Sequence, residues 1–146
     1  MKSPPTPWPL ETLNSELSVL ASLPDVIQAA IADDSGRLID CAGGSEPPAT
    51  AILVLAHATL AAASELGRRS GSGDCREIIQ QHEGGVIYLH SLTQRRVLIV
   101  RCQNTDAIPA VRSACQQFAT PLESAPPPAS TTSLDLASAL HAEPAW

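Results

Sequence analysis

Apolar residues follow two alternating patterns along the chain, one with helical spacing and one in short compact runs. Leucines at helical spacing over residues 10–22 predict a short amphipathic helix that ends before Pro24. Two apolar runs follow at 26–32 and 37–42, and the acidic and glycine residues at 33–36 separate them. This arrangement predicts a β-hairpin closed by a tight turn.

The next segment is apolar almost all round. Residues 43–48 combine glycines, a capping serine (Ser45) and prolines, so we expect a helix to begin there and to run over 49–66, before Gly67. Its apolar residues form two stripes, and few of its positions are clearly polar. Such a helix must be covered on more than one side. We expect one side to face a sheet and the other to face a second protein.

The remaining apolar runs predict three strands and a helix. The strands are expected at 75–82, 86–92 and 96–103, and their short connections suit an antiparallel meander. A final helix is expected over 106–119, with Asp106 as its cap. The order of elements predicts an α+β fold, a five-stranded antiparallel sheet with helices on both faces.

The domain limits follow from the same pattern. Residues 1–9 contain four prolines and are interpreted as an extended N-terminal arm, which places a single domain at 10–122. Residues 123–146 are interpreted as a flexible tail that begins with a linker rich in Pro, Ala, Ser and Thr. Within the tail, 133–141 has a weakly amphipathic pattern. A short docking helix and an ordinary tail both remain open there.

The charge balance argues against nucleic acid as a partner. The formal net charge is −6 and aromatic residues make up 3% of the chain. Phosphate backbones require clustered cations, and single-stranded bases stack on aromatic rings. The single lysine beside eight arginines, together with abundant alanine, is typical of a GC-rich bacterial genome.

Three further observations indicate a reduced, cytoplasmic protein. Uninterrupted apolar runs fall short of the roughly 20 residues that cross a bilayer, so we expect no membrane insertion. The N-terminus lacks the apolar stretch of a signal peptide. The four cysteines stand far apart without a Cys-x-x-Cys pair, which favours free thiols over a zinc site.

Candidate catalytic motifs have simpler explanations. The glycine-rich segment 70–73 lacks the Gly-Lys-Ser/Thr of a phosphate-binding loop. The acidic pair at 33–34 suits a turn, and His57, His82 and His90 have neither a nucleophile nor ligand spacing around them. We therefore expect no enzymatic activity, no cofactor and no metal.

Several blocks of the chain, in this order, resemble the roadblock/dynein light chain family. Residues 23–39 are similar to the opening strand, acidic-Gly turn and second strand of that family. The Ala/Leu-rich helix ending in Leu66-Gly67 resembles its central helix, and the blocks at 83–89 and 96–100 resemble its later strands. The family fold is in turn related to longin and profilin-like folds.

The resemblance implies a role. Members of the family are non-enzymatic and pair side by side, with the sheet continued across the dimer and the central helices in contact. Bacterial members often act on a small Ras-like GTPase. We therefore expect a homodimeric regulator or scaffold for such a GTPase. The alternative is a homodimeric sensory or adaptor domain that binds a peptide or small ligand without any GTPase.

The expected contact surface lies on the central helix, the arginine cluster after it and the strand that follows. The arginines are interpreted either as a solvated loop or as an arginine finger for a bound GTPase, and none is expected to be catalytic. The dimer and partner interface is assigned to Leu53, Ala56, His57, Leu60, Ser64, Arg68, Arg69, Arg76 and Ile78.

Overall fold

The structure is a computed structural model, and it describes residues 10–93 and 95–123. The arm at 1–9 and the predicted docking helix at 133–141 lie outside the described residues. The observed order of elements agrees with the sequence prediction. The elements are α1 (Leu10–Ala21), β1 (Val26–Ala32), β2 (Leu38–Gly43), α2 (Thr50–Arg69), β3 (Glu77–His82), β4 (Gly85–Leu92), β5 (Arg96–Cys102), the short 3₁₀ helix η1 (Thr105–Ala107) and α3 (Ile108–Glu123).

The five strands form one antiparallel sheet in the order β2-β1-β5-β4-β3. The predicted β1–β2 hairpin and the predicted β3–β4–β5 meander are both confirmed. Antiparallel pairing of β1 with β5 joins these two halves, with Ala30 opposite Ile99. Consequently β2 and β3 form the two edges of the sheet.

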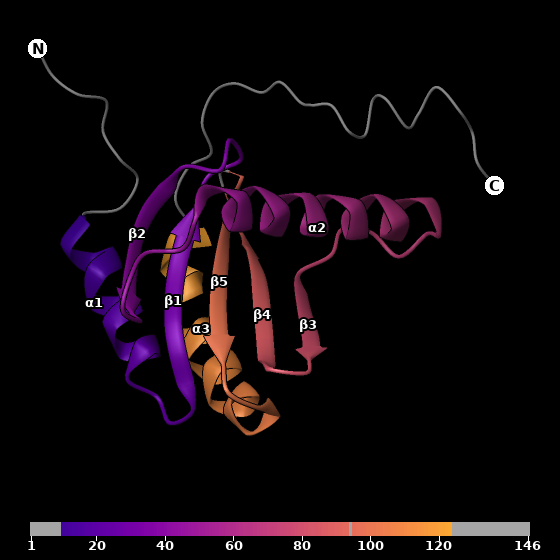
Figure 1. The fold of residues 1–146 in the computed structure, drawn as a ribbon. Coiled ribbons are helices and arrows are strands. Elements are labelled where there is room, and N and C mark those ends of the chain that lie inside the picture. Colours follow the sequence, from indigo (N-terminus) through magenta and orange to yellow (C-terminus); the bar gives the residue numbers. More distant parts are fainter. Residues whose placement is uncertain (1–9, 94, 124–146) are drawn as a thin grey trace, which may run out of the picture.

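Helices cover both faces of the sheet, as the sequence predicts (Figure 1). On one face, α1 packs on β1 and β2, and α3 packs on β4 and on α1. On the other face, α2 crosses the strands and packs on β4 and β5. The sheet is thus the middle of three layers.

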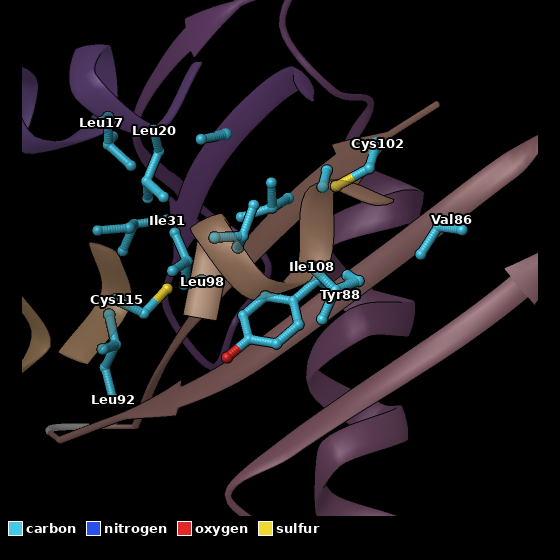
Figure 2. Close-up of a cluster of buried hydrophobic side chains, with 14 residues drawn as sticks. Leu17, Leu20, Ile31, Val86, Tyr88, Leu92, Leu98, Cys102, Ile108 and Cys115 are labelled. Atoms are coloured by element: carbon cyan, nitrogen blue, oxygen red, sulfur yellow. The ribbon is translucent and has the colours of Figure 1, made fainter. Parts of the chain in front are cut away.

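Each face of the sheet has its own hydrophobic cluster. The larger cluster lies beneath α1 and α3, and Figure 2 shows the ring of Tyr88 within it, close to Ile108. Because side chains alternate along a strand, Tyr88 enters this cluster while its neighbours Ile87 and Leu89 face α2. Each fully buried Leu or Ile stabilises the fold by about 1.5–3 kcal/mol. The smaller cluster contains Ala32, Leu53, Ala56, Leu60, Leu89, Val97 and Ile99.

The hairpin turn between β1 and β2 requires a glycine. Gly36 has a φ of +85°, in the left-handed region that other residues rarely adopt. A Cβ on Gly36 would also lie 2.3 Å from Cγ2 of Val54 on α2. The turn therefore packs directly against the first part of α2, which places this helix over the sheet.

The ends of the helices correct the sequence prediction. Gly67 does not end the central helix, because α2 continues to Arg69. The glycine instead allows the following loop to fold back: a Cβ at Gly67 would lie 2.1 Å from the carbonyl oxygen of Gly73. The backbone amides of Ser72 and Gly73 donate to the carbonyl oxygen of Gly67 at 2.7 and 3.1 Å.

Two predicted helix caps are also wrong. The residue before α2 is Ala49, which provides no side-chain cap, so Ser45 does not cap this helix. At the last helix, the side chain of Asn104 rather than Asp106 is the cap, and it accepts a hydrogen bond from the amide of Asp106. A short 3₁₀ turn therefore precedes α3, which also extends past Pro121.

Candidate interaction site

The sheet covers only one side of α2. Leu53, Ala56 and Leu60 face the sheet and are 1%, 7% and 6% exposed. The sequence pattern predicted these three residues at the surface for a second protein, and their burial in the chain's own core corrects that prediction. A helix on a flat sheet buries one side, and here that side is the stripe turned toward Leu89 and Ile99.

The second apolar stripe of α2 lies on the surface. Ile52, Leu55 and Leu66 are 46%, 64% and 56% exposed. With Thr59 and Ala62 they follow a spacing of three and four residues along about four turns of the helix. This is the spacing of a seam between two packed helices. We call these five residues the α2 stripe.

The strand β3 follows α2 in the chain and forms one edge of the sheet. It pairs with β4 in an unbroken register and has no other strand beside it among the described residues. In Figure 1, the last part of α2 reaches beyond β3, consistent with its packing on β4 and β5. A free strand edge with an overhanging apolar helix offers both backbone and side-chain contacts to another chain.

The other predicted surface residues lie nearby but differ in exposure. His57, Ser64 and Ile78 are half-buried, and Ile78 packs against the cluster beneath α2. The hydroxyl of Ser64 accepts a hydrogen bond from the amide of Cys75 at 2.9 Å, which fixes the chain where it enters β3. Arg76 is exposed. The sequence signal did not indicate Ile79, an exposed apolar residue on β3.

The two arginines at the end of α2 are held by acidic residues of the same chain. Arg69 and Arg68 contact the carboxylate of Glu65 at 2.8 and 2.9 Å, and Arg68 also pairs with Asp74. The Glu65 side chain is only 7% exposed. The hydrogen bonds from Arg68 and Arg69 hold the pKa of Glu65 below its ordinary value. The cluster is therefore partly neutralised and ordered by the chain itself.

The acidic pair at the β1–β2 turn has a structural role. Burial of Asp33 would by itself raise the pKa of this carboxyl group, but hydrogen bonds from the Arg37 amide and from Ser35 lower it below its ordinary value. Its Oδ1 atom accepts from the amides of Ser35 and Arg37 at 3.0 and 2.9 Å. Such side-chain-to-backbone bonds close a turn.

Within residues 10–93 and 95–123, no group of three or more His, Cys, Asp or Glu side chains could hold a metal ion. By length and composition alone, α2 is long and apolar enough to cross a membrane. The length of uninterrupted apolar runs does not indicate this property, because His57 and Thr59 interrupt the run. In the structure this helix packs one side against the sheet.

The three-layer fold and its free edge strand define a class of small α+β interaction domains. The chain belongs to the Roadblock/LC7 domain family, whose sequence model matches residues 14–101. Among curated proteins, none matches the chain.

Solved structures show the same fold at low sequence identity. MglB of Myxococcus xanthus superposes with a TM-score of 0.69 at 20% identity, covering 77% of this chain and 86% of that one. The gliding protein MglB of Thermus thermophilus gives 0.68 at 17% identity, covering 83% and 91%. A further MglB structure, described as having a tetrameric arrangement, gives 0.67 at 16% identity, covering 85% and 96%.

Proposed function

We propose that the chain is a non-catalytic homodimeric regulator or scaffold that binds a small Ras-like GTPase in the cytoplasm. Membership of the Roadblock/LC7 family supports a regulator or adaptor in a GTPase pathway. One observation carries the dimer: α2 has an exposed apolar stripe, and its last part reaches beyond the free edge strand β3 (Figure 1).

The α2 stripe fits an antiparallel contact with its own copy. In such a pair centred on Thr59, Ile52 lies opposite Leu66 of the second copy, and Thr59 faces Thr59. Large residues then meet at both ends of the contact, while Thr59 and Ala62 allow the helix axes to approach closely in the middle. A two-fold axis makes both ends of the seam identical.

The β3 edge fits the same two-fold axis. If the axis is perpendicular to the sheet, both α2 helices lie on the same face of the joined sheet. Residues that pair between the two copies of β3 must then point to the same face. An axis through Ile79 meets this condition and covers an apolar side chain that is exposed in the single chain. A stable dimer of this kind should bury on the order of 1,600 Å² in total.

Cysteine cross-linking tests the dimer and its register together. Thr59→Cys should form an intermolecular disulfide under mild oxidation, because the two sulfur atoms meet at the axis. Ala58→Cys is the matched control, since Ala58 is exposed on α2 but lies outside the α2 stripe. Mass spectrometry identifies the linked residues, and light scattering gives the oligomeric mass. A monomer mass at micromolar concentration would contradict the proposal.

Calorimetry tests the GTPase partner. Small Ras-like GTPases of the source organism, each loaded with GDP or with a non-hydrolysable GTP analogue, are titrated with the purified dimer. A regulator must bind the two states with different affinity, so we expect tighter binding of the GTP form. Equal affinity would reduce the role to that of a scaffold. Absence of binding to every GTPase tested would favour the sensory or adaptor alternative.

A further inference from the structure

A salt bridge links the first residue of the edge strand β3 to the helix α3. Glu77, the first residue of β3, lies on the face of the sheet that α3 covers. Its carboxylate oxygens accept hydrogen bonds from Arg112 of α3, with N–O distances of 2.6, 3.1 and 3.2 Å. Two guanidinium nitrogens take part, so the pair has the forked geometry that fixes direction as well as distance.

The same carboxylate holds a fully buried phenol. Oη of Tyr88 lies 2.8 Å from Oε1 of Glu77 and 3.2 Å from Nδ1 of His90. A phenol has one proton, and the carboxylate can only accept, so Tyr88 donates to Glu77 and His90 must donate its Nδ1 proton to Tyr88. Glu77 therefore accepts hydrogen bonds from Tyr88 of β4 and from Arg112 of α3.

This cluster matters because β3 has little other support. Among elements within residues 10–93 and 95–123, only β4 packs extensively on β3, while α2 and α3 lie over the inner strands. All six β3 residues are accordingly half-buried or exposed. An edge strand held from one side frays easily, because few contacts oppose its opening. The salt bridge between Glu77 and Arg112 adds a contact that links β3 to α3.

We propose that Arg112 is a positioning residue for the dimer edge. By holding Glu77, it keeps the beginning of β3 aligned with β4 and ready to pair with a second copy of the chain. This inference rests on the proposed homodimer. Arg112 itself lies on α3, outside the proposed contact between the two copies, and acts through the strand.

The test compares Arg112→Gln with the wild-type full chain. Loss of the charged pair should speed amide hydrogen exchange of the peptide containing β3 and raise the dimer dissociation constant, each by about tenfold, because hydrogen bonds to charged groups are the stronger ones. Exchange in β1 and β5 should stay unchanged. Arg112→Lys keeps the charge but not the fork, so it should restore part of both effects.

Arg95→Gln is the matched control. Arg95 pairs with Asp34 of the β1–β2 turn at 3.0 Å, with side chains about as exposed as those of Arg112 and Glu77. This variant should match Arg112→Gln in the small loss of melting temperature but leave β3 exchange and dimer affinity at wild-type values.

A double variant and the oligomeric mass of the wild-type chain in solution complete the test. Adding Glu77→Gln to Arg112→Gln should weaken the dimer no further, because both substitutions remove the same pair. Unchanged β3 exchange in Arg112→Gln would overturn the role of Arg112. A wild-type chain that stays monomeric would overturn the homodimer instead. Exchange is compared at a concentration low enough for both chains to be monomeric, so that pairing of β3 with a second copy does not protect its amides. The two failures are therefore distinguishable.

Discussion

Two leucines of α2, only five positions apart, should respond in opposite ways to the same substitution. Leu55 belongs to the α2 stripe and is 64% exposed, whereas Leu60 faces the sheet and is 6% exposed. Both lie in the interior of one helix, so replacement by alanine changes helix propensity equally. Any difference between the variants reports on what each side chain contacts.

The exposures set the expected magnitudes. Removing Leu60 deletes a buried side chain and leaves a cavity, which should lower the free energy of unfolding by about 2–5 kcal/mol. Leu55 is largely solvated in the single chain, so its loss should change monomer stability by less than about 0.5 kcal/mol. In a two-fold dimer the Leu55 substitution occurs twice. Full burial of a leucine contributes about 1.5–3 kcal/mol, so two partly buried copies should weaken the dimer by about 2–4 kcal/mol.

The assay must separate folding from association. Sedimentation across a range of concentrations gives the dimer affinity, and denaturation at low concentration, where the monomer dominates, gives its own stability. We expect Leu55→Ala to lower affinity by a factor of about 30 to 1,000 and to leave the monomer folded. Leu60→Ala should lower monomer stability first. If Leu55→Ala left the dimer intact or unfolded the monomer, the assignment of the two sides of α2 would be refuted.

Three further predictions follow from individual contacts. Gly67→Ala should lower the melting temperature measured by circular dichroism, although alanine favours helix by about 1 kcal/mol, because its Cβ would lie 2.1 Å from the carbonyl oxygen of Gly73. Hydrogen bonds from Arg112 hold the pKa of Glu77 below its ordinary 4.5, so this carboxylate stabilises the folded state above pH 4.5 and loses that effect as the pH falls through its folded-state pKa. In urea denaturation at a series of pH values, the free energy of unfolding should therefore fall less steeply with decreasing pH in Glu77→Gln than in the wild type. Burial raises the pKa of Cys115 to about 12, so alkylation of the native protein near pH 8, mapped by mass spectrometry, should modify half-buried Cys75 and spare Cys115.

The strands were predictable because their signals are local. Each is a compact apolar run bounded by glycine, acidic or polar turn residues, as at Gly36 and Gly85. The three hairpins, β1–β2, β3–β4 and β4–β5, follow from short connections between adjacent runs. The pairing of β1 with β5 has no such signal, because it joins strands far apart in the chain. The order of the strands in the sheet therefore became visible only in the structure.

The site was harder to predict because both stripes of α2 have helical spacing. Periodicity reports that two sides are apolar, but it does not report which side the sheet covers. Leu53 and Leu60 were therefore assigned to the interface, while Ile52 and Leu55, which face solvent, were not. The tie between Glu77 and Arg112 spans 35 residues and two elements. No short motif marks such a pair, since its partners meet only after the layers pack.

The two edges of the sheet are unequal, and this inequality explains why the proposed dimer uses β3. At the β2 edge, the pairing with β1 has an irregular register between Ile31 and Ala32, and α1 packs on the strand. Bulges and covering helices protect an edge from further pairing. At the β3 edge, six consecutive residues pair with β4 in register, and no helix packs extensively on the strand among the described elements. A regular and uncovered edge beneath an overhanging apolar helix lowers the cost of adding one more strand, because the pairing register is already unbroken and the helix can cover the added strand.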